Sequence, residues 1–274
     1  MLRFVSAGRS DVGLVRGNNE DSGFAGPYLL LVADGVGGAA AGEVASATAA
    51  YVASALSMAE PAGDVLDVLA RAVRLTFEQL RAGTRLDDRR AGMGTTFTAL
   101  LTDGARVGLG HVGDSRCYLL RDGELTQLTR DHTFVQTLVD SGVLTREEAR
   151  HHPRKNVVMQ ALDGETPAMP DLVLLDLRPG DRLLLCSDGL TDLVEDRQLA
   201  LGLEHADPEE AASSLVDAAL AAGGSDNVTC LVCDVVDAPR VVPDGRQLGA
   251  FGDPWLVVDP AAVHATPAGP VSAS

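Results

Sequence analysis

An unbroken apolar run at residues 29–33, ending in Asp34 and Gly35, constrains the fold of this chain more than any other stretch. Such a run is typical of a strand buried on both faces, which delivers one carboxylate to the edge of a sheet. The glycine allows a backbone carbonyl to approach a ligand or ion beside the acid. Because a strand followed by Asp-Gly also makes ordinary turns, a single occurrence leaves both a turn and a site open.

The same arrangement recurs along the chain. Asp188 follows the apolar run 183–186, Asp114 follows a softer run, and Asp226 comes just before another apolar run. If the strand after Asp226 runs antiparallel to the strand before Asp188, these two acids lie at the same edge of a sheet. Crowded carboxylates repel one another unless a cation is present, and oxygen ligands suit Mg²⁺ or Mn²⁺ rather than Zn²⁺. The sequence therefore predicts a hard-metal site.

A polar loop ahead of the first run carries three further candidates. The Arg16 guanidinium either grips two phosphate oxygens or is a solvated surface group. Glu20 and Asp21 either join the metal shell or cap a turn, and taken alone they favour the cap.

Composition restricts the partners and the compartment. The 274 residues include 22 Lys and Arg against 39 Asp and Glu, a formal net charge of −17, so attraction to nucleic acid or an anionic bilayer is not expected. The sequence begins with no signal-peptide pattern, and no apolar run reaches the ~18 residues of a membrane span. Cys230 and Cys233 form a C-x-x-C, but residues three apart on a strand face opposite sides, which favours core positions over ligands. We expect a soluble, cytoplasmic protein with reduced cysteines.

The apolar periodicity predicts both helices and strands. Helical spacing at residues 42–58 and 65–80 predicts an antiparallel helix pair over a sheet face. Strand composition with two Asp-Gly turns predicts an antiparallel meander over residues 95–120. Further strands at 172–177 and 182–186, a helix at 208–222 and a last strand ending at Val236 complete the pattern.

Two segments lack this regular pattern of strands and helices. Residues 130–164 form an insertion with its own charge pattern, which predicts a lid over a site. Its His151-His152 pair is interpreted as solvated rather than metal-binding. Beyond the domain at 1–237, residues 238–274 are rich in Pro and Ala and predict an extended or disordered tail, from which Phe251 and Trp255 are candidates to dock back.

Six short motifs follow one another in a characteristic order. They are Arg16 with Asn19-Glu20-Asp21, Ala33-Asp34-Gly35-Val36-Gly37-Gly38, Gly94-Thr95-Thr96, Gly113-Asp114-Ser115-Arg116, Ser187-Asp188-Gly189 and Ser225-Asp226-Asn227. From about residue 6 to 236, the chain resembles the bacterial branch of the metal-dependent type 2C (PPM) serine/threonine protein phosphatases. The resemblance implies an α+β fold, a four-layer α-β-β-α sandwich of two antiparallel sheets flanked by helix pairs.

The resemblance also implies a ligand set for two Mn²⁺ or Mg²⁺ ions. Asp34 matches the acid that bridges both ions, the Gly35 carbonyl binds one of them, and Asp188 and Asp226 hold the other. Asp114 matches a ligand, shared with Asp188, of a third and weaker ion. Lid residue Asn156, which aligns loosely, is a candidate further ligand of that ion.

The implied activity is hydrolysis of phosphoserine and phosphothreonine by direct attack of a metal-bridging hydroxide, without a phospho-enzyme. Glu20 and Asp21 match acids that act through metal-bound water, with Asp21 orienting the hydroxide, and Arg16 matches the phosphate-binding arginine. Val36 stands where some relatives have a histidine general acid, and it cannot donate a proton. Metal-bound water or the surroundings of the substrate must then protonate the leaving oxygen.

The implied partners are phosphorylated proteins in bacterial signalling, both the substrates of serine/threonine kinases and the kinases themselves. A monomer without a nucleic-acid partner is expected. The alternative is a non-catalytic phosphoprotein-binding regulatory module on the same fold, but loss of catalysis would leave gaps among Asp34, Asp188 and Asp226, and all three are present. A calcium module is disfavoured because the acids are dispersed instead of lying in one loop.

Overall fold

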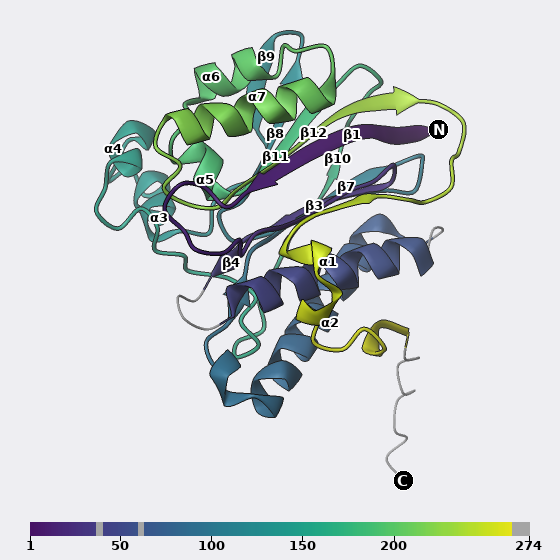
Figure 1. Cartoon of the computed structure of the whole chain (residues 1–274). Helices are drawn as coiled ribbons and strands as arrows, with labels where there is room; N and C mark the ends of the chain where they lie inside the picture. Colours follow the sequence, from purple (N-terminus) through teal and green to yellow (C-terminus); the bar gives the residue numbers. More distant parts are fainter. Residues whose placement is uncertain (37–40, 60–62, 265–274) are drawn as a thin grey trace.

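Two antiparallel β-sheets lie face to face at the centre of the computed structural model, which describes residues 1–36, 41–59 and 63–264 (Figure 1). The five-stranded sheet has the order β1 (Leu2–Asp11), β12 (Val228–Asp237), β11 (Arg182–Cys186), β8 (Arg116–Arg121) and β9 (Glu124–Gln127). The six-stranded sheet has the order β10 (Asp171–Leu175), β7 (Val107–Val112), β6 (Phe97–Thr102), β3 (Leu29–Ala33), β2 (Ser22–Ala25) and β13 (Arg246–Gly249). A short pair, β4 (Gly35–Val36) with β5 (Gly94–Thr95), follows β3.

Helices cover the outer face of each sheet. The pair α1 (Gly42–Ala59) and α2 (Val65–Leu86) packs on the six-stranded sheet, and α5 (Asp188–Thr191), α6 (Asp196–Gly202) and α7 (Pro208–Ala221) pack on the other. The remaining helices are α3 (Phe134–Asp140) and α4 (Arg146–Arg150), with short 3₁₀ turns at Asp88–Arg90, Ala250–Gly252, Pro254–Leu256 and Ala262–His264. The predicted α+β, four-layer α-β-β-α sandwich is confirmed.

Side-chain alternation along β3 shows how the layers are held together. Leu29 and Leu31 pack in the cluster under α1 and α2, whereas Leu30 and Val32 pack between the two sheets. All five β3 residues are buried, as the apolar run predicted. Burial on both faces fixes the position of the end of the strand, and Asp34 is the next residue.

The predicted single meander is wrong in one respect. The turns at Asp103-Gly104 and Asp122-Gly123 do connect antiparallel pairs, β6 with β7 and β8 with β9. However, β7 and β8 lie in different sheets, because the chain crosses between the layers at Gly113, which has φ +106°. Strand composition predicts an extended segment but does not say which sheet it joins.

The predicted disordered tail is also corrected in part. Residues 246–249 form β13, which pairs with β2, and Phe251 packs into the core beside Phe24. Trp255, the other candidate for docking, is 89% exposed. The edge of a sheet offers unpaired N–H and C=O groups, so even a four-residue segment of low hydrophobicity can pair with it. Within the described residues, no helix combines the length and apolar character needed to cross a bilayer.

Candidate metal centre

The predicted acids come from separate elements and meet at one end of the sandwich. Asp34 follows β3, Asp114 lies two residues beyond β7, Asp188 begins α5 and Asp226 precedes β12. Strands β11 and β12 are antiparallel neighbours, so Asp188 and Asp226 share an edge, as the conditional prediction requires. Asp34 and Asp188 lie close enough for their carboxyl groups to share a hydrogen bond.

Asp21 lies at the buried side of this cluster. Its side chain has no solvent exposure, and Oδ2 accepts a hydrogen bond from the Ser187 hydroxyl at 2.7 Å. The other oxygen, Oδ1, has no hydrogen-bond partner among the described residues. An unpartnered buried carboxylate oxygen is costly in free energy, and such an atom fits a site for a cation or its water. The structure therefore favours the metal shell over a turn cap for Asp21.

Burial and crowding hold protons on these carboxyl groups. Burial, reinforced by repulsion from neighbouring acids, raises the pKa of Asp21 to about 7 and that of Asp188 to about 6. The same causes, burial first, raise the pKa of Asp34 and of Asp114 well above the ordinary range. A divalent cation would relieve this repulsion, and the all-oxygen donor set suits Mg²⁺ or Mn²⁺. Among the described residues, however, no group of three or more His, Cys, Asp or Glu is already arranged to hold a metal ion.

Neighbouring motif residues fix the backbone of Asp34. Its N–H donates to the Thr96 hydroxyl at 2.9 Å, and its carbonyl accepts from the Thr96 N–H and the Thr95 hydroxyl. Gly35 has no room for a side chain, since a Cβ would lie 2.6 Å from the Gly42 backbone and 2.7 Å from the Glu20 carbonyl. Gly37 and Gly38 of the same motif lie outside the described residues.

Arg16 and Glu20 stand at the mouth of the cluster. Arg16 is exposed and donates from Nη2 to Asp226 Oδ2 at 2.8 Å, so it lies beside one of the candidate acids. Glu20 is partly buried, which raises its pKa. Its backbone N–H donates to Asn227 Oδ1 at 2.8 Å. The Asn227 amide also donates to the carbonyl of Asn18, so one side chain holds the loop that carries both candidates.

Sequence reasoning missed these supporting roles. Ser187 and Asn227 each lie next to a candidate acid, and Thr96 lies in a motif without an acid, but nothing in these motifs says which neighbour the side chain contacts. For Ser187 and Asn227, adjacency to a candidate ligand was the available signal. In metal sites, such neighbours orient the ligands, and this is the arrangement seen here.

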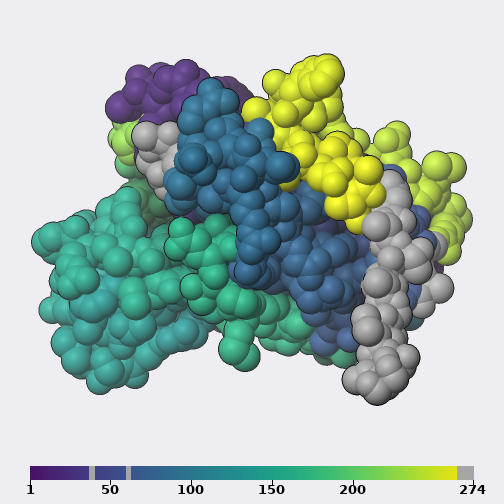
Figure 2. Space-filling view, turned by 90° about the horizontal axis from the view of Figure 1, so that it is seen from below, coloured from purple at the N-terminus to yellow at the C-terminus, as the bar shows by residue number. Residues whose placement is uncertain are grey.

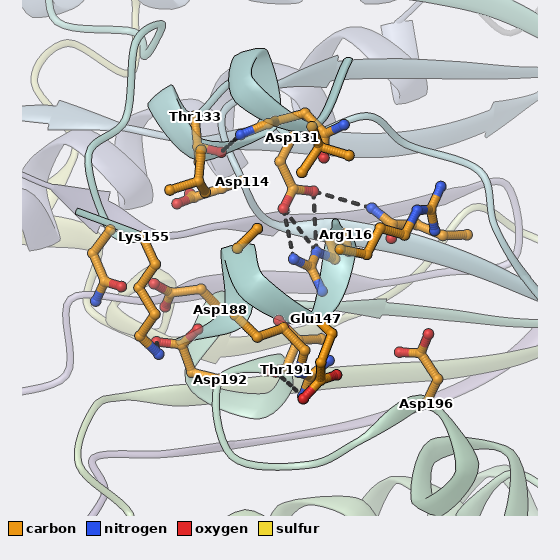
Figure 3. A pocket seen from close by; sticks show the side chains of 18 of the residues that line it. Asp114, Arg116, Asp131, Thr133, Glu147, Lys155, Asp188, Thr191, Asp192 and Asp196 are labelled. Atoms are coloured by element: carbon orange, nitrogen blue, oxygen red, sulfur yellow. Dashed lines mark hydrogen bonds and ion pairs between the residues drawn. The ribbon is translucent and has the colours of Figure 1, made fainter. Parts of the chain in front are cut away.

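The lid segment, residues 130–164, borders a cavity of about 350 Å³ that also includes Asp114, Asp188 and Asn156 (Figure 3). Lys155 pairs with Asp192 of the α5 end at 2.7 Å, which links the lid segment to the opposite wall. Asn156 thus lines the same cavity as Asp114, the position expected of a candidate further ligand of the third ion.

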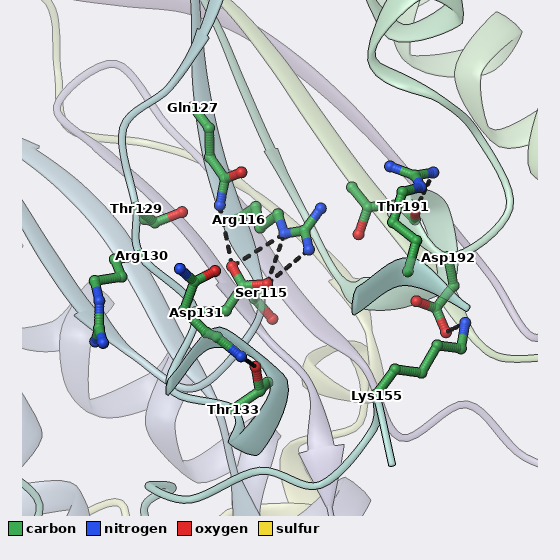
Figure 4. A network of polar contacts seen from close by, with 12 residues as sticks. Ser115, Arg116, Gln127, Thr129, Arg130, Asp131, Thr133, Lys155, Thr191 and Asp192 are labelled. Atoms are coloured by element: carbon green, nitrogen blue, oxygen red, sulfur yellow. Dashed lines mark hydrogen bonds and ion pairs between the residues drawn. The ribbon is translucent and has the colours of Figure 1, made fainter. Parts of the chain in front are cut away.

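A partly buried ion pair forms part of the wall of this cavity. Arg116 contacts both Asp131 oxygens, the shorter distance being 2.6 Å (Figure 4). It also donates to the Tyr118 hydroxyl. By contrast, His151 is exposed and pairs with Glu147 on α4, as expected of a solvated histidine.

Fold and site together define a β-sandwich protein with a buried acidic rim suited to divalent cations. The family model for Protein phosphatase 2C matches residues 18–222. The chain belongs to this family. It is 52% identical over 237 residues to the serine/threonine protein phosphatase PstP of Mycobacterium tuberculosis, and 35% identical over 241 residues to the serine/threonine phosphatase Stp of Listeria welshimeri.

Those alignments cover 86% and 82% of this chain, and 46% and 94% of the two relatives. The chain therefore spans about half the length of its mycobacterial relative. A crystal structure of the PstP catalytic domain in complex with two manganese ions superposes with a TM-score of 0.81, at 51% identity, covering 86% of this chain and 100% of that one. The phosphatase MsPP from Mycobacterium smegmatis, in complex with cacodylate, gives 0.76 at 39% identity, covering 84% and 97%.

The raised pKa values predict an unusual pH dependence of stability for the metal-free protein. In a chelating buffer, the free energy of unfolding is expected to fall from about pH 4 to about pH 7, because folded Asp21 and Asp188 keep protons that the unfolded chain has lost. The slope is at most ~1.4 kcal/mol per pH unit for each such acid. Urea denaturation across this range measures it. An Asp21→Asn variant should show a smaller slope, and equal slopes would contradict the assignment.

Proposed function

We propose that this chain is a metal-dependent phosphoprotein phosphatase that hydrolyses phosphoserine and phosphothreonine. The observation that carries the proposal is the buried acid cluster, in which one Asp21 oxygen has no partner among the described residues. The cluster lies at the rim of a protein phosphatase 2C fold.

We assign the ligands to two Mn²⁺ or Mg²⁺ ions. Asp34 would be shared by the two ions, the Gly35 carbonyl would join it at one of them, and Asp188 and Asp226 would hold the other. In this structure, Asp34 shares a hydrogen bond with Asp188, and Asp226 pairs with Arg16. The two manganese ions in the PstP catalytic domain support this assignment. A third, weaker ion is assigned to the cavity wall formed by Asp114, Asp188 and Asn156.

When bound, the paired cations lower the pKa of water and supply a nucleophile for in-line attack on phosphorus. Asp21 is placed to orient that group through its unpartnered Oδ1, while Ser187 holds Oδ2. Glu20 acts through water at the same ions. On release from Asp226, the Arg16 guanidinium binds two phosphoryl oxygens and neutralises their charge.

The leaving oxygen needs a proton, and the side chain that follows Gly35 cannot supply it. That residue, Val36, is held in β4 opposite Gly94 and carries no donor. The proton therefore comes from water or from the surroundings of the substrate.

We propose phosphorylated proteins as substrates, including the targets of bacterial serine/threonine kinases and the kinases themselves. The chain acts as a monomer in this proposal. A cytoplasmic location agrees with four cysteines that are all unpaired and buried. The alternative of a non-catalytic phosphoprotein-binding module finds no support from the acid cluster, which lacks none of its expected members.

Removal of one ligand carboxylate tests the assigned centre. Asp34→Asn and Asp188→Asn are each expected to lower Mn²⁺-dependent hydrolysis of p-nitrophenyl phosphate by more than about 100-fold, since loss of even a supporting residue at a metal site costs about 10–100-fold. Asp217→Asn, which changes an exposed acid paired with Arg9 on the protein surface, is the matched control. Activity that survives both substitutions would reject the centre.

Substitution of the guanidinium tests phosphate recognition. Arg16→Ala is expected to raise KM for p-nitrophenyl phosphate by about 10-fold or more, because a charge-assisted hydrogen bond contributes roughly 1.5–3 kcal/mol. Arg74→Ala removes an exposed arginine of α2 and should change nothing. Unchanged KM and kcat in Arg16→Ala would exclude Arg16 from the site.

A further inference from the structure

The C-terminal strap, residues 246–263, reaches the candidate metal centre from outside the matched family region. The family match ends at residue 222, and the last strand of the predicted domain ends at Asp237. Beyond it the chain returns as β13, which adds a sixth strand beside β2, and then passes along α1 as three 3₁₀ turns. In Figure 2 the yellow strap lies against the blue helices.

The register of β13 places its end beside Asp21. Leu248 lies opposite Gly23 and Gly249 lies opposite Ser22, the residue that follows Asp21. The next N–H, that of Ala250, donates to the Asp21 carbonyl at 2.8 Å. The strap thus provides the hydrogen-bond donor for the Asp21 main-chain carbonyl. Asp21 is also the residue whose side-chain Oδ1 has no partner among the described residues.

Gly249 packs directly against the backbone of Asp21, with no room for a side chain. Its backbone has φ +60°, a conformation that favours glycine, and a Cβ would lie 2.1 Å from the Asp21 carbonyl oxygen and 3.0 Å from Ser10 Oγ. Ser10 Oγ in turn accepts from the Asn19 amide at 2.8 Å, and Asn19 Oδ1 accepts from the Asp21 N–H. A side chain at position 249 would therefore meet both the Asp21 carbonyl and the Ser10 hydroxyl, which is linked through Asn19 to the Asp21 N–H.

Three apolar anchors, Leu248, Phe251 and Val263, hold the strap in place. Leu248 packs between the sheets, and Phe251 packs in the cluster under α1 with its ring centroid 6.3 Å from that of Phe24. Further along, Val263 is buried in the same cluster, and the Tyr51 hydroxyl donates to the Pro260 carbonyl at 3.0 Å. These contacts pack the strap firmly enough to constrain its neighbours.

We infer that the strap is a positioning element of the metal centre: Gly249 and Ala250 set the Asp21 backbone and, through it, the direction of the Asp21 carboxylate. The expected effect on catalysis rests on the proposed function, whereas the expected effect on metal binding does not. Neighbours that orient a metal ligand act on affinity and rate without touching the substrate.

Two full-length variants with different lesions test the contact. Gly249→Ala adds the Cβ that meets the Asp21 carbonyl, and Ala250→Pro removes the N–H that donates to it. Proline is tolerated at the first residue of a helical turn, where Ala250 stands, so the second variant keeps the test available if the first fails to fold. Gly252→Ala is the matched control, because its added Cβ meets nothing within 4 Å.

Three quantities are measured for each variant: the Mn²⁺ dissociation constant by calorimetry, kcat and KM for p-nitrophenyl phosphate at saturating Mn²⁺, and the midpoint of thermal unfolding. For Gly249→Ala and Ala250→Pro we expect weaker Mn²⁺ binding by about 10-fold or more and a lower kcat with little change in KM. Gly252→Ala should match the wild type in all three.

A purely structural strap gives a different pattern. In that case Gly249→Ala and Ala250→Pro lower only the unfolding midpoint, with Mn²⁺ affinity and kcat unchanged below it, and the inference is overturned. It is also overturned if Val263→Ala, a cavity at the far anchor, reduces Mn²⁺ affinity and kcat equally while the protein is folded. A wild-type protein without phosphatase activity would reject the proposed function alone, since Mn²⁺ binding still reports on the strap.

Discussion

Repulsion among carboxyl groups buried at one rim is the constraint on which this structure depends. Asp21, Asp34, Asp114 and Asp188 all have raised pKa values because burial and mutual proximity disfavour their charged forms. A fold that only needed stability would separate such groups or replace them with apolar ones. Holding them together is useful where a bound cation offsets the repulsion, and the ionised cluster then becomes a ligand set.

The backbones of Asp34 and Glu20 are held by different parts of the chain. Thr95 and Thr96 hold Asp34 from β5 and the residue that follows it. Asn227 holds Glu20 from the start of β12. These contacts come from segments next to strands β5 and β12, so the packed strands act on the site through single hydrogen bonds. Rigid elements of this kind are what a preorganised site requires.

Much of this arrangement could be predicted from local sequence patterns. The buried strand before Asp34, the helix pair after it and the gathering of acids at a shared edge follow from apolar runs and strand direction. The pairing of β8 with β11 instead of β7 did not, because sheet membership depends on contacts distant in sequence. A four-residue strand at Arg246–Gly249 was likewise hidden by a Pro-rich composition. The roles of Ser187 and Asn227 depend on three-dimensional proximity, which a motif does not encode.

The central claim is that carboxylates from both sheets converge on paired cations, and anomalous diffraction at the manganese absorption edge tests it most directly. Crystals grown with Mn²⁺ are predicted to show two anomalous peaks at the rim, both touching Asp34, with Asp188 and Asp226 at one of them. Crystals saturated with Mn²⁺ that show no peak among these three side chains, while the fold is unchanged, would contradict the account.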